Sequence, residues 1–189
     1  MIQPSIIFKI ITGGDGGVGK TTMLHRYIEG KFSFDTKMTI GVEIFHKIVT
    51  LKDGYTCSLQ LWDFGGQERF RFFLDNLVRG AMGAFLMYDI TDRYTFDNLP
   101  KWVDIVRKYD PTLPIVLLRA KCDLTEKAEV SDESTKEFME LCKISGFYRV
   151  SSKTGYNINE AFEALTNIIV DYKGIKIVTP NDFLKLWNT

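Results

Sequence analysis

The sequence predicts an α/β fold, with a mostly parallel six-stranded sheet, one antiparallel edge strand, and helices on both faces, which makes three layers. Two observations carry this prediction. Six apolar runs alternate with segments of helical periodicity over most of the chain, as expected for βαβ units. The second and third runs flank an Asp53-Gly54 turn, which is typical of an antiparallel hairpin.

The first apolar run, residues 6–11, leads directly into a glycine-rich stretch and then into a helical pattern. Residues 14–21 read GDGGVGKT, which fits the GxxxxGK[ST] pattern of a phosphate-binding loop. Glycines let backbone N–H groups turn toward phosphate oxygens, Lys20 supplies a positive charge, and the Thr21 hydroxyl is a ligand for Mg²⁺. The residues that we predict to hold the phosphates are Asp15, Gly16, Gly17, Val18, Gly19, Lys20, Thr21 and Thr22.

The remaining elements follow from periodicity. A helix is expected from Thr22 to Glu29, ending at Gly30, a favoured residue just past a helix end. Further strands are expected at 42–51, 57–62, 83–90, 115–118 and 147–150, and further helices at 96–109, 132–142 and 157–172. In such a sheet, ligands bind beyond the carboxyl ends of the strands, so the loops there are the candidate functional residues.

Composition narrows the class of protein. The chain has 189 residues, which we divide into one domain, residues 1–175, and a tail, residues 176–189. Lys and Arg together number 24, as do Asp and Glu, so no net field favours nucleic acid. The three cysteines are far apart, and no apolar run is long enough to span a membrane, so we expect a cytoplasmic protein in a reducing compartment.

Two loops at the strand ends carry further candidate residues. Thr39 precedes the second strand and offers a second hydroxyl to Mg²⁺ when a γ-phosphate is present. At the end of the third strand, Asp63 is expected to hold Mg²⁺ through water, and Gly66 to offer a backbone N–H to the γ-phosphate. Gln67 then orients a water for in-line attack and is the predicted catalytic residue.

These motifs resemble those of the small GTPases of the Ras superfamily, over residues 6–172, and most closely the Rab branch. Residues 39–43 (TIGVE) resemble its TIGVD, residues 61–70 (LWDFGGQERF) its LWDTAGQERF, and residues 88–91 (YDIT) are identical to its YDIT. The resemblance implies a P-loop G domain that binds GTP and GDP with Mg²⁺. It also implies that Phe32 packs edge-on against the guanine.

Guanine recognition in this family uses an N-K-x-D string, and here residues 120–123 read AKCD. Asp123 keeps the carboxylate that accepts from guanine, and the stem of Lys121 can lie over the base. Residues 151–153 (SSK) resemble the SAK loop, so Ser151, Ser152 and Lys153 are further predicted base contacts. Because Ala120 lacks the amide that ties this loop to the phosphate loop, we expect faster nucleotide release than with asparagine.

The resemblance implies a molecular switch that hydrolyses GTP slowly and orders two loops, around Thr39 and from Gly66 to about Arg79. No arginine of the chain is obviously placed to reach the γ-phosphate, so an activating protein is expected, with an exchange factor and effectors. Phe72, Ile40 and Ile44, around Trp62, are the expected partner-facing surface. By contrast Phe70, Phe73, Leu74 and Leu77, at helical spacing, are expected in the core.

Two alternatives stand beside this interpretation. One is a nucleotide-loaded binding module with negligible turnover, which the presence of Gln67 and Asp63 disfavours. The other is a P-loop ATPase or small-molecule kinase, which Asp123 and the lack of a long, arginine-rich insertion disfavour. No cysteine follows Cys142, so we expect no evident lipid anchor. We also expect the protein to be a monomer. We expect the tail, with Phe183, Leu184, Leu186 and Trp187, to form a short amphipathic helix that docks on its own domain or contacts a partner or a membrane surface.

Overall fold

Six strands form one sheet in the order β2-β3-β1-β4-β5-β6 in the computed structural model, which describes residues 6–33, 38–51, 54, 56–66, 74 and 76–175. The strands are β1 (Ile6–Gly13), β2 (Val42–Thr50), β3 (Thr56–Phe64), β4 (Gly83–Asp89), β5 (Ile115–Ala120) and β6 (Gly146–Arg149). The helices are α1 (Lys20–Glu29), α3 (Arg93–Asp97), α4 (Leu99–Val106), the 3₁₀ helix η2 (Cys122–Lys127), α5 (Asp132–Leu141) and α6 (Ile158–Tyr172).

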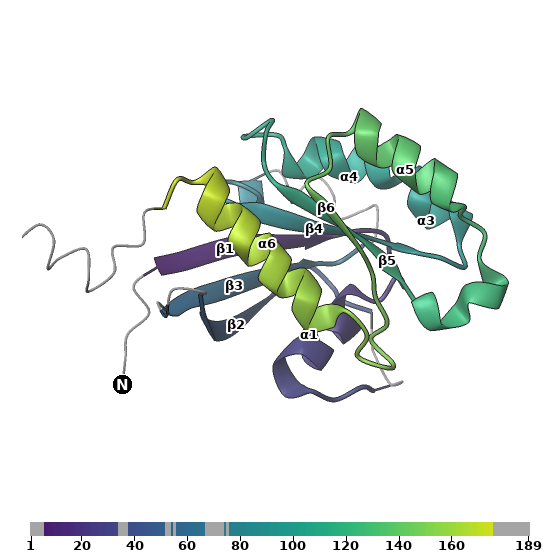
Figure 1. The fold of residues 1–189 in the computed structure, drawn as a ribbon, viewed down its shortest axis with the longest axis horizontal. Coiled ribbons are helices and arrows are strands. Elements are labelled where there is room, and N and C mark those ends of the chain that lie inside the picture. The colour runs from purple at the N-terminus through teal and green to yellow at the C-terminus, as the bar shows by residue number, and fades with distance from the viewer. Residues whose placement is uncertain are drawn as a thin grey trace, which may run out of the picture.

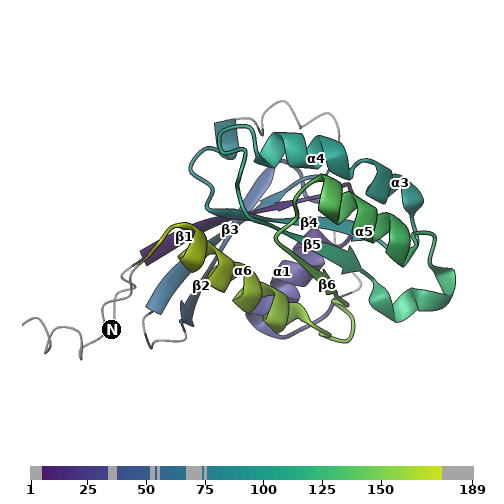
Figure 2. The same ribbon diagram turned by 45° about the horizontal axis from the view of Figure 1, so that its top comes forward.

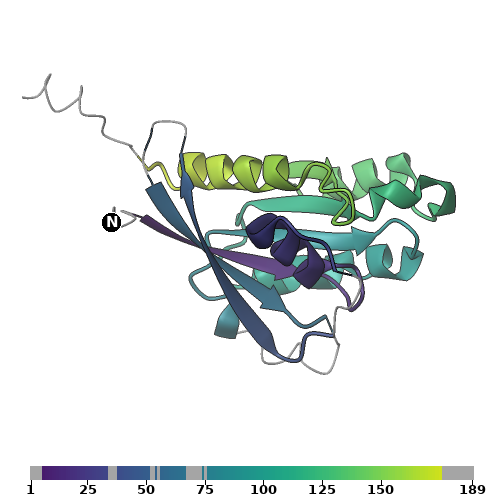
Figure 3. The ribbon, with the colours of Figure 1, turned by 90° about the horizontal axis from the view of Figure 1, so that it is seen from below.

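The pairing of the strands confirms the predicted sheet. β2 pairs antiparallel with β3, and all the other neighbours are parallel. β3 continues two residues past the predicted end at Trp62, because Phe64 still pairs with Val42. Asp63 therefore lies within the strand and is held by its ladder. Figure 3 shows the twist of the sheet, in which the β2–β3 hairpin crosses β1.

The apolar side chains form two cores, one on each face of the sheet. α1 and α6 cover one face, where Leu24 and Phe162 pack against Phe8 and Ile10 of β1. α3, α4 and α5 lie on the other face, where Trp102 packs against the side of β1 that carries Ile11. Figures 1 and 2 show these helices flanking the sheet, which confirms the three predicted layers.

One expected helix, residues 96–109, is in fact two helices that meet at Asn98. The first begins earlier, at Arg93, because the Asp92 carboxylate caps it by accepting from the Tyr94 N–H at 3.1 Å. Pro100 has no N–H to continue the helical ladder, so the chain starts again at Leu99 as α4, with the proline in its first turn. The prediction of a continuous helix was therefore wrong, although its buried stripe runs across the break.

Loops that follow the parallel strands gather at one end of the molecule. The β1–α1 loop, the end of β3 and the loops after β5 and β6 all lie there, because parallel strands share their carboxyl edge. The C-terminal end of α6 and the beginning of β1 lie at the opposite end (Figure 1). Within the described part of the chain, no helix is both long and apolar enough to cross a membrane. The expected tail helix lies outside the described residues.

Candidate nucleotide-binding site

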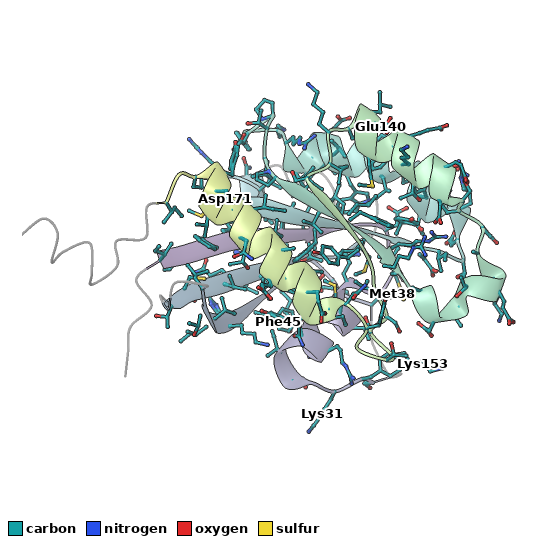
Figure 4. All side chains as sticks on the ribbon, viewed as in Figure 1. Lys31, Met38, Phe45, Glu140, Lys153 and Asp171 are labelled. Carbon is teal, nitrogen blue, oxygen red and sulfur yellow. The ribbon has the colours of Figure 1, made fainter. Side chains whose placement is uncertain are left out.

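A cavity of about 470 Å³ opens at the carboxyl edge of the sheet. Its lining consists of Gly16, Gly17, Val18, Gly19, Lys20, Thr21, Thr22, Phe32, Ser33, Met38, Thr39, Gly66, Ala120, Lys121, Asp123, Leu124, Ser152 and Lys153. Met38 and Lys153, both labelled in Figure 4, line this cavity although they are far apart in the sequence. Segments far apart in the sequence thus share one site.

The β1–α1 loop has a backbone that only glycine adopts easily. Gly17 and Gly19 have φ values of 80° and 102°, and a Cβ at either position would meet no atom within 4 Å. Conformation, rather than crowding, is therefore the reason for glycine at both positions. The loop ends where α1 begins at Lys20, so the positive end of the helix dipole lies at the cavity.

Lys20 places a cation in the wall of the cavity. Its Nζ donates to the carbonyl oxygens of Gly14, at 2.7 Å, and Asp15, at 2.8 Å, and the side chain is only 5% exposed. Burial lowers the pKa of Lys20 to about 8, while the carboxylates of Asp63 and Asp15 act in the opposite direction. A desolvated ammonium of this kind interacts strongly with an anion that enters the cavity.

Asp15 is placed by two side chains that sequence reasoning missed. Its carboxylate accepts from Asn98 Nδ2 at 2.7 Å and from Trp102 Nε1 at 2.8 Å, and all three residues are buried. The break between α3 and α4 thus anchors the phosphate loop. Neither residue stands at a fixed offset from a motif, so the sequence offers no signal for this contact. The side chain of Asp15 is not part of the cavity wall.

Thr21, Thr39 and Asp63 come together at one end of the cavity. The Oγ1 atoms of the two threonines are 2.6 Å apart, and Asp63 Oδ2 accepts from Thr21 at 2.5 Å and from Thr39 at 3.3 Å. Asp63 is fully buried, and burial raises its pKa. Among the described residues, its Oδ1 atom has no hydrogen-bond partner.

This oxygen cluster fits a hard cation such as Mg²⁺, which prefers hydroxyl, carboxylate and water oxygens and retains several waters. A buried carboxylate with one unpartnered oxygen is the kind of group that a cation or its water would satisfy. No group of three His, Cys, Asp or Glu side chains that could hold a metal is found in the described ranges. The chemistry of the cluster therefore rests on one carboxylate and two hydroxyls.

Gly66 lies directly against the phosphate loop. A Cβ at this position would lie 2.3 Å from the carbonyl carbon of Asp15 and 2.3 Å from the backbone nitrogen of Gly16. At the preceding residue, the Gly65 N–H donates to the Gly41 carbonyl at 2.9 Å, which joins the ends of the two predicted switch loops. Gln67, the predicted catalytic residue, lies outside the described residues.

The opposite wall of the cavity is formed by the loops after β5 and β6. Three residues predicted to contact the base, Asp123, Lys121 and Ser152, line it together with Phe32 from the segment after α1. Lys121 adopts a left-handed backbone conformation, with φ 57°, and its ammonium pairs with the carboxylate of Asp89 at the end of β4. This ion pair was not predicted, although Asp89 belongs to the YDIT motif.

Ser151 holds Asp123 rather than lining the cavity. The fully buried Ser151 Oγ donates to Asp123 Oδ1 at 2.6 Å and accepts from the Thr154 N–H at 3.2 Å. This contact joins the loop after β5 to the loop after β6, behind the part of the cavity wall that is predicted to bind guanine. Of the predicted site residues within the described ranges, Asp15, Asp63 and Ser151 lie behind the wall, and the others line it. Sequence reasoning missed Ser33, Met38 and Leu124.

The expected partner-facing surface is partly described. Ile40 is 75% exposed and Ile44 is 44% exposed, as expected for a surface that a partner would cover. Trp62 is half-buried, with Lys9 Nζ 3.9 Å from the centre of its ring. Phe72 lies outside the described residues. Of the four residues expected in the core, Leu74 is buried and Leu77 is partly buried, whereas Phe70 and Phe73 are not described.

Known proteins with similar sequences share most of this chain. The Ras family matches residues 9–171. Ras-related protein Rab11A of Lotus japonicus is 40% identical over 173 residues, which cover 89% of this chain and 76% of that protein. Ras-related protein RABA3 of Arabidopsis thaliana is 38% identical, with coverages of 90% and 74%, and Ras-related protein YPTC6 of Chlamydomonas reinhardtii is 36% identical, with coverages of 93% and 81%.

Proposed function

This chain belongs to the Ras family, in its Rab branch, and on that premise we propose that it is a GTP-dependent switch that binds GTP and GDP and slowly hydrolyses GTP. The observation that carries the proposal is the joining of the phosphate loop, the Thr21–Thr39–Asp63 cluster and the Asp123 loop around one cavity. Two of the relatives named above, Rab11A and RABA3, carry Rab names, which supports a role in trafficking or signalling.

In this proposal each wall of the cavity has one task. Lys20 and the backbone N–H groups of the glycine loop bind the β- and γ-phosphates. The Asp123 carboxylate accepts from the N1–H and the 2-amino group of guanine. Adenine does not present two donors in this arrangement. Thr21, Thr39 and Asp63 are the residues that would hold Mg²⁺, which would neutralise part of the negative charge of the phosphates when bound.

The same geometry supports a link between the nucleotide and the shape of the surface. Thr39 belongs to the segment that carries the exposed Ile40, and Gly66 precedes the segment that carries the predicted water-positioning Gln67. A γ-phosphate that engages Thr39 and Gly66 would order both segments, and its loss would release them. Effectors, an activating protein and an exchange factor are the partners proposed to read or change this state.

A single-turnover measurement tests the proposed activity. We expect the purified protein to carry bound GDP and, with Mg²⁺, to hydrolyse GTP but not ATP. Replacing Gln67 by leucine removes the amide that orients the attacking water, so hydrolysis slows by about 100-fold. Chromatography of the released nucleotide and rapid-quench assays provide the readout, with the ATP reaction as the control.

Two results of these assays would contradict the switch. Equal turnover of GTP and ATP would mean that Asp123 does not select guanine. Bound nucleotide without any turnover, with Gln67 intact, would favour the alternative of a nucleotide-loaded binding module.

Ala120 gives a second prediction, on nucleotide retention. Ala120 lines the cavity and is buried, but its methyl group cannot hydrogen-bond to the phosphate loop. We expect Ala120→Asn to slow GDP release by about 10-fold, because one well-placed hydrogen bond in a desolvated site contributes about 1.4 kcal/mol. Stopped-flow release of a fluorescent GDP analogue measures this rate, with Ala120→Ser as the matched smaller change. An asparagine variant that releases GDP as fast as the parent would contradict the hypothesis.

A further inference from the structure

Arg119 and Arg149 occupy paired positions on the neighbouring parallel strands β5 and β6. Like charges at paired positions of adjacent strands repel each other and destabilise the pairing. Arg119 is 5% exposed, so water does little to screen its charge. Arg119 therefore needs a compensating anion, whereas the side chain of Arg149 is 51% exposed and partly solvated.

Asp132, the first residue of α5, is that anion. Its Oδ1 accepts from Arg119 Nη1, and its Oδ2 accepts from Arg149 Nη2 at 2.6 Å. Arg119 Nη2 also donates to the Val130 carbonyl at 2.8 Å, which fixes the segment just before α5. The hydrogen bond from Arg119 lowers the pKa of Asp132, so its carboxylate stays ionised at neutral pH. One side chain thus bridges two cations on two strands.

Each arginine stands directly before one of the loops that form the base side of the cavity. Arg119 precedes Ala120 and the loop that carries Asp123, and Arg149 precedes Val150 and the loop that carries Ser152. The two strand ends are joined at this level by the Val150 N–H, which donates to the Arg119 carbonyl at 2.9 Å. The Cys122 N–H then donates to the Val150 carbonyl at 3.1 Å. The spacing of the strands here sets the spacing of the loops.

We propose that the Arg119–Asp132–Arg149 bridge positions the two base-binding loops and thereby sets guanine selectivity and nucleotide retention. The proposal rests on the proposed function, because it assigns a positioning role at the same cavity. None of the three side chains lines the cavity, so they act through Asp123 and Ser152 rather than by contact with the base. The bridge joins the ends of β5 and β6 to the start of α5, a connection separate from the tie to the phosphate loop that Ala120 lacks.

The test is the Asp132→Asn variant, which removes the charge and keeps the shape. We expect the two arginines to repel, the strand ends to separate and GDP release to become about 10-fold faster, since coupled charge networks of this size are worth about 1.4 kcal/mol. Inosine diphosphate lacks the 2-amino group that Asp123 would bind. The preference for GDP over inosine diphosphate should therefore fall about fivefold, a change that a loss of stability alone would not produce.

Two further variants isolate the charge effect. Glu140→Gln is the matched control, because Glu140 is an exposed carboxylate of the same helix that pairs with Lys136 at 4.0 Å and is labelled far from Lys153 in Figure 4. This variant should leave the rate of GDP release and the preference for GDP over inosine diphosphate unchanged. Adding Arg149→Gln to Asp132→Asn removes one of the two like charges and should restore most of the retention, which a purely structural loss of Asp132 would not allow.

The outcomes separate this inference from the proposed function. A parent protein without any preference for GDP over ADP would overturn both. A parent that prefers GDP, with a folded Asp132→Asn variant that keeps its release rate and its base preference, would overturn the bridge alone. Should Asp132→Asn not fold, the Arg149→Gln variant decides by itself, because it keeps the ion pair between the buried Arg119 and the exposed Asp132. GDP release from Arg149→Gln that is two- to threefold faster than from the parent supports the proposal, and an unchanged rate overturns it.

Discussion

We expect the Lys20→Met variant to bind GDP about 10³-fold more weakly than the parent protein. The Lys20 ammonium is buried in the cavity wall and held by two carbonyl oxygens of the phosphate loop, so it is already aimed and desolvated. Loss of one partner from a buried charge pair weakens binding by about 4 kcal/mol, which corresponds to this factor. Isothermal titration of nucleotide-free protein with GDP measures the change.

The control must show whether weaker GDP binding by Lys20→Met comes from the missing ammonium or from unfolding of the protein. Methionine keeps the apolar stem of Lys20 and removes its ammonium. Because burial lowers the pKa of Lys20 to about 8, the charged form is costly to bury in the nucleotide-free protein. The nucleotide-free Lys20→Met variant should therefore unfold at or above the unfolding temperature of the parent protein. Lys31→Met, which removes an exposed lysine outside the cavity, should bind GDP normally. An affinity within tenfold of the parent for Lys20→Met would show that this ammonium does not bind phosphate.

The second large effect is expected at Gly66. An alanine Cβ there would lie 2.3 Å from backbone atoms of Asp15 and Gly16, and neither can move without deforming the phosphate loop. Gly66→Ala should therefore prevent this segment from approaching the γ-phosphate and slow GTP hydrolysis by about 10³-fold, as loss of a positioned backbone donor does in other active sites. Single-turnover hydrolysis of GTP measures the loss.

GDP binding provides the internal control for this variant. GDP has no γ-phosphate for the Gly66 N–H to meet, so its affinity should stay within a few-fold of the parent. A Gly66→Ala variant that hydrolyses GTP at the parental rate would show that the close contact with Asp15 and Gly16 is not used in the reaction. Loss of GDP binding together with hydrolysis would point instead to a deformed phosphate loop.

Local patterns in the sequence determined the elements and the residue types of the site. The six strands, the antiparallel hairpin and the glycine-rich loop follow from periodicity and turn chemistry, which act over a few residues. Because parallel strands share one carboxyl edge, Asp63 and Asp123 were expected at one place, and Thr39 precedes the antiparallel strand β2, whose beginning lies at the same edge. Pro100 was a signal in the sequence for the break at Asn98, but the buried stripe that continues across the break favoured one helix, and the contact of Asn98 with Asp15 appears only on folding.

Only the tertiary structure decided which side chains touch each other. Asp15 with Asn98 and Trp102, Lys121 with Asp89, and Asp132 with two arginines are contacts between segments that the chain brings together only on folding. Their partners have no fixed spacing, because the offset depends on the lengths of the intervening helices and loops. A motif names the group that the chemistry requires, whereas the packing of distant segments decides how firmly that group is held.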